Sequence, residues 1–287
     1  MSKYSPLLNN PGSLHTLLSV ADSEDLALLA DYISDNGSGR LSLSNDACKR
    51  LTACSNHKLF TPGDRSLVAN EILLFGGNSI ANVYRGFFKK SADNAGATAT
   101  IDYAELVSDV AKKVDASFGE GASVPEIEDA ILLRIFKQAF DKMPEAERKK
   151  VLEELGVTSF GALRGVGAGA VVSAALSMAS LNVASSVASA VSAQVLGRAA
   201  MTSASLVGSR GLAAIAGPVG IAVATLWTLA DLSSPAYRVT LPCVVQVAYM
   251  RKRYLAELYA NKCPHCSHDN HAAAKFCGEC GKALEAS

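Results

Sequence analysis

The stretch SVPEIEDAILLRIFKQAF, residues 123–140, decides the fold class of this chain. It opens with Ser123 and, three residues later, Glu126, which is the capping-box pattern of a helix N-terminus. Pro125 lies just inside this start, where its missing N–H is not needed. Behind it, apolar side chains recur at helical spacing: Ile127, Ile131, Ile135, Phe136 and Phe140. The pattern predicts an amphipathic helix that buries one face in a core.

Helical signals continue on both sides of this stretch, through residues 1–156. Residues 23–33 carry an apolar stripe that is broken by Asn36-Gly37-Ser38-Gly39. Thr61 followed by Pro62 predicts another helix start. Further helices are expected over residues 103–114 and 144–155. Because no strand alternation is visible, the sequence predicts that this region is all-α.

A pair of glycines, Gly76-Gly77, predicts the end of the helix that starts at Pro62. A new helix is then expected to start at Asn78 or Ser79 and to run through Phe87. The N-terminus of that helix would offer free N–H groups, so an anion site after the glycines is an alternative that the sequence leaves open.

The composition excludes several classes of protein. Of the 287 residues, 19% are charged and 49% belong to the AVILMFWYC set, which excludes wholesale disorder. Seven cysteines are too few for a disulfide-stapled mini-protein of this length. The 27 basic and 27 acidic residues cancel, so no nucleic-acid partner is expected. The first 20 residues lack the apolar core of a secretory signal, which favours a cytoplasmic location.

The composition changes abruptly to Ala, Gly, Ser and Val between residues 161 and 230. Residues 165–197 and residues 211–230 contain no charged side chain, and Arg198 and Arg210 lie between them. Each charge-free run is long enough to cross a hydrocarbon core of about 30 Å as a helix. The two runs therefore predict a hydrophobic helical hairpin, which a helix over residues 237–259 closes.

Two interpretations of this hairpin remain open. In the first, the surrounding amphipathic helices shield the hairpin until it enters the lipid of the inner membrane, or it is permanently inserted there. Such a hairpin resembles in composition that of colicin-type pore-forming domains. The basic run Arg251-Lys252-Arg253 would then face anionic headgroups. In the second, the hairpin is the Ala-rich core of a soluble bundle, which its many serines favour.

Four cysteines near the C-terminus form two C-x-x-C knuckles with ten residues between them: Cys263, Cys266, Cys277 and Cys280. Four thiolates at this spacing suit a tetrahedral Zn²⁺ with bonds of about 2.3 Å, and a site closed by four protein ligands is structural. The run resembles the short zinc ribbons found at the ends of many prokaryotic proteins, except for Ser267 where those modules usually have Gly. The nearby histidines, His265, His268 and His271, are expected to be spectators.

Other candidate sites are weaker. Cys48, Cys54 and His57 do not have knuckle spacing and lack a fourth ligand, so ordinary thiols are the simpler interpretation. Gly165-Val-Gly167-Ala-Gly169 lacks the spacing and the preceding strand of a nucleotide loop. No catalytic motif is present, and the sequence predicts that the protein is not an enzyme and has no catalytic or cofactor-binding residues.

Two local motifs carry a family resemblance. The first is Phe75-Gly76-Gly77-Asn78-Ser79-Ile80-Ala81-Asn82, and the second is Gly217-Pro218-Val219-Gly220 followed by Ala236-Tyr237-Arg238-Val239-Thr240-Leu241-Pro242. Their order resembles the YaaW-like family of uncharacterised bacterial proteins, which is grouped loosely with ubiquinol–cytochrome c chaperones. The resemblance covers about residues 15–258 and implies a bacterial, all-helical protein with a chaperone-like alternative. It implies no active site.

Together these features predict an all-α protein in three parts. Residues 1–156 form an amphipathic helical region, residues 157–260 form the hydrophobic hairpin and its closing helix, and residues 261–287 form the zinc ribbon. The leading functional hypothesis is a non-enzymatic, membrane-associated effector that inserts into or permeabilises a bilayer and uses its ribbon for protein contact. The alternative is a soluble chaperone or assembly factor with a protein partner. The oligomeric state stays open.

Overall fold

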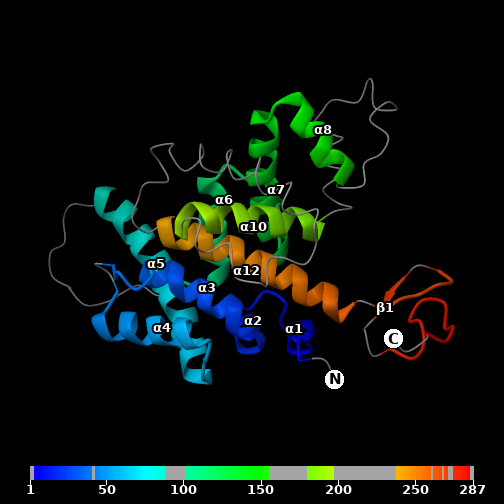
Figure 1. Cartoon of the computed structure of the whole chain (residues 1–287), viewed down its shortest axis with the longest axis horizontal. Coiled ribbons are helices and arrows are strands. Elements are labelled where there is room, and N and C mark those ends of the chain that lie inside the picture. Colours follow the sequence, from blue (N-terminus) through cyan, green and yellow to red (C-terminus); the bar gives the residue numbers. More distant parts are fainter. Residues whose placement is uncertain are drawn as a thin grey trace.

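The computed structural model describes residues 3–40, 43–87, 101–154, 180–196, 237–259, 261–266, 268–270 and 274–284. Over these residues the chain forms a body of helices, with a small module at one end (Figure 1). The all-α prediction is therefore confirmed.

The helical body consists of the helices that share one hydrophobic core. Its helices α1 to α7 are Pro6–Asn9, Leu14–Val20, Ser23–Ser34, Asn45–His57, Pro62–Phe87, Tyr103–Lys113 and Val124–Lys142, and the helix α8, Glu145–Glu154, follows α7 in the chain. They are followed by α10 (Ser180–Leu196) and α12 (Tyr237–Leu258). The module beyond α12, which we call the ribbon, contains the strands β1 (Asn261–Lys262) and β2 (Asp269–Asn270).

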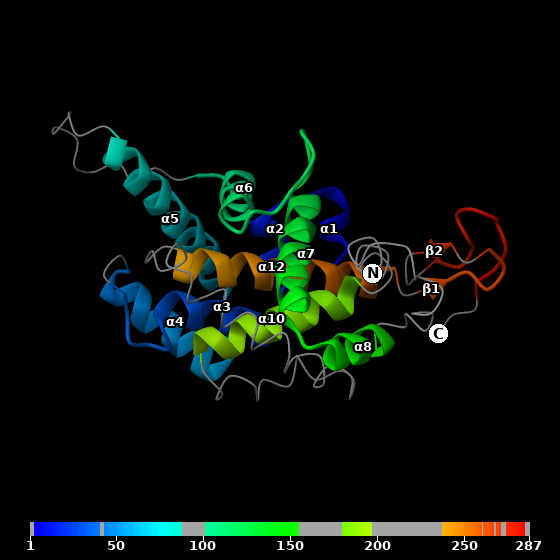
Figure 2. The same cartoon turned by 90° about the horizontal axis from the view of Figure 1, so that it is seen from above.

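Helix α12 is the axis of the helical body. It packs against α10, α7, α3, α5 and α6, and Figure 2 shows it running through the middle of the molecule. Its residues from Val239 to Arg251 are buried without interruption. A helix that is buried on all sides needs apolar residues all round, which explains the run of Val and Ala residues in its sequence. The core thus joins α12 to the helices of residues 1–156.

Helix α10 is the part of the predicted hairpin that the structure describes, and it lies within the same core. It packs against α12, α7 and α3. Three of its serines are buried, and two of them donate to backbone carbonyls of their own helix: Ser186 Oγ to Val183 at 2.9 Å and Ser192 Oγ to Ala188 at 2.8 Å. The hydroxyl of Ser192 also forms a hydrogen bond with that of Tyr32 on α3. Serines therefore fit this core because these buried hydroxyls have partners nearby.

The remainder of the hairpin, within residues 165–230, lies outside the described residues, as does the glycine run at 165–169. Among the helices that the structure describes, none combines the length and the apolarity needed to cross a bilayer.

The capping signals are confirmed. The backbone N–H of Ser123 donates to the carboxylate of Glu126 at 2.7 Å, which is one half of the predicted capping box at the start of α7. At the start of α5, the N–H of Thr61 donates to Asp64 at 2.8 Å. These short-range pairs form because the first N–H groups of a helix have no partner inside the helix.

The predicted break at Gly76-Gly77 is wrong, because α5 continues through both glycines to Phe87. A Cβ atom at position 76 would lie 2.7 Å from the Cδ1 atoms of Ile101 and Leu106. The helix keeps a glycine there so that Ile101 and Leu106, at the start of α6, can approach its backbone. Glycine destabilises a helix by about 1 kcal/mol relative to alanine. The close packing of Ile101 and Leu106 against α5 offsets this loss. The alternative of an anion site at a new N-terminus is also removed.

The basic run Arg251-Lys252-Arg253 does not form a free patch, in contrast to the membrane-facing role considered above. Arg251 is buried and pairs with the buried carboxylate of Glu128 on α7, with Nε to Oε2 at 2.7 Å. Lys252 pairs with Asp129 at 2.9 Å, and Arg253 pairs with carboxylates at the start of α3. All three cations are thus paired with carboxylates of the helical body itself, because α12 is central rather than peripheral.

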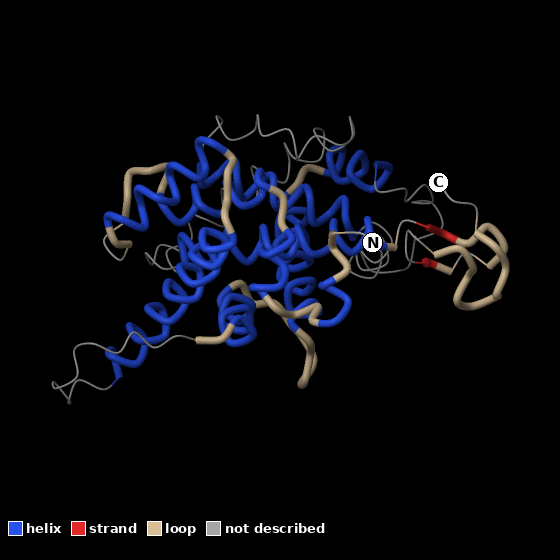
Figure 3. The backbone as a smooth tube through the Cα atoms, turned by 90° about the horizontal axis from the view of Figure 1, so that it is seen from below, coloured by secondary structure: helices blue, strands red, loops and turns tan. Residues whose placement is uncertain are grey.

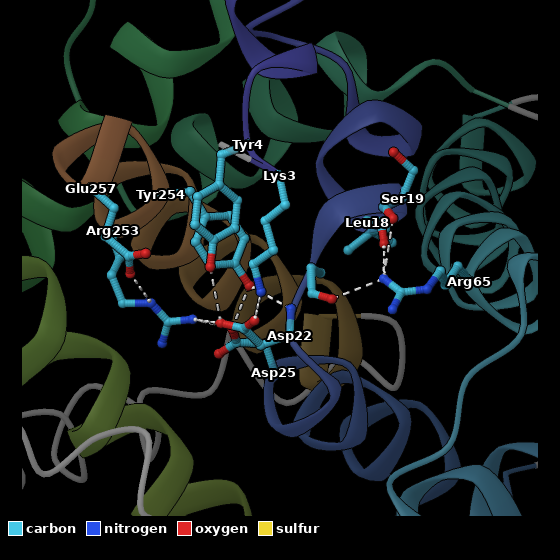
Figure 4. A network of polar contacts seen from close by, with 11 residues as sticks. Lys3, Tyr4, Leu18, Ser19, Asp22, Asp25, Arg65, Arg253, Tyr254 and Glu257 are labelled. Atoms are coloured by element: carbon cyan, nitrogen blue, oxygen red, sulfur yellow. Dashed lines mark hydrogen bonds and ion pairs between the residues drawn. The ribbon is translucent and has the colours of Figure 1, made fainter. Parts of the chain in front are cut away.

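A second polar cluster ties the N-terminal segment to α12 (Figure 4). The guanidinium of Arg253 lies 2.8 Å from Asp22 and 2.5 Å from Asp25. The hydroxyl of Tyr254 donates to Asp25 and accepts the N–H of Asp22, while its ring stacks on Tyr4 with centroids 4.3 Å apart. Burial raises the pKa of Asp25, and the neighbouring Arg253 opposes this rise. The cluster stabilises the start of α3 against α12.

Candidate metal centre

The ribbon positions its four cysteines with two backbone turns of the same kind. Strands β1 and β2 pair antiparallel, and Cys263 follows β1 directly. The N–H of Cys263 donates to the carbonyl of His268 at 2.9 Å, and the N–H of Cys277 donates to that of Lys282 at 2.8 Å. Each of these hydrogen bonds closes a knuckle around two cysteines. Figure 3 shows the two short strands at one end of the molecule, beyond the helices.

The four sulfur atoms fit a single metal ion. Their Sγ atoms all lie within 4.8 Å of one another, with Cys263 and Cys280 3.6 Å apart and Cys266 and Cys277 3.5 Å apart. A tetrahedral zinc ion with bonds of about 2.3 Å sets its sulfurs about 3.8 Å apart. Within the described residues, these cysteines are the one set of His, Cys, Asp or Glu side chains grouped closely enough to hold a metal. The predicted ligands are therefore brought together.

Backbone N–H groups favour the thiolate form at three of the four positions, and at two of these the pKa of the thiol is lowered. The N–H of Cys280 lowers the pKa of Cys277 to about 6. Burial opposes ionisation of Cys263, but the N–H groups of His265 and Cys266 outweigh it and lower the pKa of that thiol. N–H groups that point at a sulfur stabilise its negative charge, which is the form that binds a metal.

The thiol of Cys266 ionises less easily in the same place. The N–H of His268 favours the thiolate of Cys266, but partial desolvation and the surrounding cysteine sulfurs raise its pKa to about 12. Like charges this close disfavour one another unless a cation lies between them. A divalent metal removes this conflict, so the donor set fits a structural zinc ion, with which all four thiols would bind as thiolates.

The ribbon has almost no core of its own. Among its described residues, the buried apolar ones are Cys263, Cys277 and Leu284, and Ala274 packs against them. Cys266 and Cys280 are exposed. A module with so little buried surface needs a metal or a disulfide to fold, and its cysteines are free.

The two histidines near the knuckles that the structure describes do not join the group. His265 lies on the surface, where its Nδ1 is 3.3 Å from Nζ of Lys282. His268 contributes its backbone carbonyl rather than its ring. His271 lies outside the described residues. The interpretation of His265 and His268 as spectators agrees with these positions.

The sequence alone did not identify one polar residue of the ribbon. Asn270, at the end of β2, is buried, and its side-chain oxygen accepts the N–H of Gly278 at 2.9 Å. Nothing in the sequence distinguishes it from the neighbouring Asp269, because its role depends on how the two knuckles face each other.

Within the described part of the helical body, the cysteines form no metal group. Cys54 is buried, and Cys54 and His57 line a pocket of about 450 Å³ beside α4 and α5. Cys48 is half-buried, and its thiol is directed to the carbonyl of Gly37 at 3.9 Å. Because Cys48, Cys54 and His57 do not come within one coordination shell, ordinary thiols remain the simpler interpretation.

The same pocket is lined by an ion pair whose polar groups already have partners. Arg50 donates to both carboxylate oxygens of Asp64, at 2.6 and 2.9 Å. Asp64 also accepts the hydroxyl of Thr61 at 2.6 Å. The apolar part of the lining comes from Ala53, Leu59 and Phe60. Among these described lining residues, no pair of free carboxylates is available for acid–base chemistry.

Comparison with known proteins identifies relatives in two bacteria. A UPF0174 protein of Helicobacter pylori strain J99 is 28% identical over 187 residues, which cover 64% of this chain and 69% of the relative. A second UPF0174 protein of that strain is 29% identical over 200 residues, which cover 66% of this chain and 88% of the relative. No family model and no solved structure matches the chain.

A longer stretch of similarity relates the chain to the UPF0174 protein YaaW of Escherichia coli K12, which is 28% identical over 236 residues. These residues cover 80% of this chain and 89% of the relative. The names of the relatives mention neither chaperones nor zinc. The chain is thus similar over most of its length to UPF0174 proteins, which supports the predicted resemblance to YaaW-like proteins.

Proposed function

We propose that this chain is a non-enzymatic, partner-binding protein of the UPF0174 type, in which a zinc-stabilised ribbon is the contact module. The observation that carries the proposal is the exposure of Phe276 on the ribbon. Its side chain is 65% exposed and immediately precedes the ligand Cys277. Aromatic side chains such as Phe are enriched in protein–protein interfaces relative to the rest of the surface.

The surroundings of Phe276 indicate what kind of surface it fits. Lys275 and Lys282, on the two chain segments that meet at the second knuckle, are both exposed. A partner with an apolar pocket and acidic groups around it would complement this arrangement. The zinc ion would hold the knuckle in shape and would not take part in a reaction, because four cysteines leave it no open position.

The helical body serves as the scaffold in this proposal. Its buried cation Arg251 is paired internally with Glu128, so it needs no external anion to neutralise it. A cytoplasmic location is part of the proposal, since the described cysteines are free thiols. The chaperone or assembly-factor hypothesis belongs to the same class, because it also requires a protein partner.

The experiment compares the full-length protein with two variants during affinity purification and crosslinking mass spectrometry. Phe276→Ala removes the exposed aromatic of the ribbon, whereas Leu59→Ala removes a side chain that is 72% exposed on the helical body. We expect crosslinks from Lys275 and Lys282 to a protein partner, lost in Phe276→Ala and kept in Leu59→Ala. A partner that Phe276→Ala retains in full would contradict the proposal.

Membrane association is a second candidate, supported by the charge-free residues 165–197 and 211–230. Its test is fractionation of cells that express the untagged protein, followed by salt and carbonate washes of the membranes. Protein that resists carbonate would support insertion of the hairpin. Protein recovered entirely without membranes would remove constitutive insertion and favour the partner-binding proposal.

A further inference from the structure

The side chain of Asn270 lies between the two knuckles of the ribbon. It is 6% exposed, although it belongs to a module that is otherwise largely open to solvent. Its Oδ1 accepts the N–H of Gly278, in the second knuckle, at 2.9 Å. Its Nδ2 donates to the carbonyl of His268 at 2.9 Å, and that carbonyl also accepts the N–H of Cys263 in the first knuckle.

The same amide nitrogen approaches a metal ligand. Nδ2 of Asn270 lies 3.7 Å from Sγ of Cys277, within hydrogen-bond distance for sulfur. The orientation of the amide is determined by its neighbours, because the N–H of Gly278 can only donate and the carbonyl of His268 can only accept. One side chain therefore links the first knuckle, the second knuckle and one sulfur.

This position requires an amide. It must accept on one side and donate twice on the other, which a hydroxyl of serine is too short to do and a carboxylate cannot do. A carboxylate would also add negative charge beside four thiolates, which keep the site negative even after a zinc ion binds. Asn270 and Asp269 both have their backbones paired in the sheet, with Asn261 and Lys262, so the requirement concerns the side chain of Asn270.

We propose that Asn270 is a positioning residue of the metal centre: it holds the second knuckle against the first and stabilises the thiolate of Cys277 by an N–H···S bond. The proposal rests on zinc binding by the four cysteines, as proposed above. Residues that orient metal ligands from outside the coordination shell typically change metal affinity about 10–100-fold when they are replaced.

The experiment measures zinc affinity of the full-length protein by competition with a chromophoric chelator. Three variants are compared: Asn270→Ala removes the whole link, Asn270→Asp keeps the size and the acceptor but removes the donor, and Glu279→Ala changes an exposed side chain of the same knuckle. We expect about 10–100-fold weaker binding for both Asn270 variants and wild-type affinity for Glu279→Ala.

A spectroscopic measurement separates positioning from mere filling of space. In the cobalt-substituted protein, loss of the N–H···S bond raises the energy of the sulfur lone pairs, so the sulfur-to-cobalt charge-transfer band should shift to lower energy in both Asn270 variants. Circular dichroism of the helices should stay unchanged, because the ribbon has a core separate from that of the helical body.

Three outcomes would overturn the inference. Wild-type affinity in both Asn270 variants would show that the link has no role. Wild-type affinity and an unshifted band in Asn270→Asp alone would show that the side chain only fills space. Absence of zinc binding by the wild-type protein would instead contradict the metal centre itself, together with this inference.

Discussion

Fifteen residues of α12 are buried in the helical body, whereas the hydrophobic core of the ribbon beyond its end consists of Cys263, Cys277 and Leu284. The two regions are joined by a short connection after Leu258, yet they are stabilised by different means. Burial of apolar surface stabilises the helical body at about 25 cal/mol per Å². The ribbon buries too little for this, so its fold depends on coordination of a metal. The difference predicts that each region can be perturbed while the other stays folded.

The largest expected effect is loss of the metal. Cys277→Ser, or chelation of the wild-type protein, should unfold the ribbon, because apparent binding free energies of structural zinc are about 10–16 kcal/mol. Hydrogen exchange should become fast at residues 261–284 and stay slow in α12. Equal loss of protection in α12 would contradict the separation of the two regions.

The second effect concerns the buried ion pair of the helical body. Glu128→Ala leaves the guanidinium of Arg251 buried without its carboxylate partner, which should destabilise the protein by about 3–5 kcal/mol. The hydroxyl of Tyr103, which donates to Glu128 at 2.8 Å, loses its acceptor as well. Chemical denaturation followed by circular dichroism measures the change, while zinc affinity should be unaffected.

A matched control lies one residue away on each helix. Lys252 and Asp129 form an ion pair at 2.9 Å, but the carboxylate of Asp129 is 52% exposed. Asp129→Ala should therefore lower the free energy of unfolding by less than about 1 kcal/mol. If Asp129→Ala and Glu128→Ala lowered the free energy of unfolding equally, burial of an ion pair would not determine how much it stabilises the protein.

These pairs also show where prediction from the sequence reached its limit. The knuckles of the ribbon and the capping box at Ser123 were predicted because their partners lie within a few residues of each other, so spacing alone indicates the chemistry. Arg251 and Glu128 are 123 positions apart, so their spacing along the chain does not indicate that the two charges meet. Their pairing exists only once α7 and α12 pack together.

The break predicted at Gly76 failed for the same reason. Glycine usually ends a helix, and the local sequence offers no evidence against an end. The constraint that keeps glycine inside α5 comes from Ile101 and Leu106, which belong to a later part of the chain. Local signals thus predicted the metal ligands and most helix starts, whereas contacts between distant segments determined helix continuity and the fate of buried charges.

The third prediction tests this explanation of Gly76. Gly76→Ala places a methyl group 2.7 Å from Ile101 and Leu106, so it should destabilise the helical body by about 1–3 kcal/mol despite the better helix propensity of alanine. Gly63→Ala, in the first turn of the same helix, meets no atom closer than 3.7 Å and should be neutral or slightly stabilising. The midpoint of thermal unfolding compares the two variants. A stable Gly76→Ala protein would show that α6 can shift away.

The smallest expected effect is the pH dependence contributed by Asp64 at the start of α5. Hydrogen bonds from Arg50 and Thr61 hold the pKa of this carboxyl well below its usual value, although burial opposes them. A group whose pKa is lower in the folded state stabilises the protein above its unfolded pKa of about 3.9, and this contribution is lost as the pH falls below that value.

Because the guanidinium of Arg50 is 55% exposed and screened by solvent, we expect a contribution of about 1 kcal/mol at neutral pH. Asp64→Asn should lower the free energy of unfolding by this amount at pH 7 and by much less at pH 3, whereas Asp129→Asn should change little at either pH. If Asp64→Asn lowered the free energy of unfolding equally at pH 3 and pH 7, the side chain of Asp64 would act through its shape rather than its charge. Zinc coordination should be lost at a higher pH than the contribution of Asp64, because protons compete for the thiolates of the ribbon well before they reach Asp64. The ribbon should therefore unfold in acid while α5 is still intact.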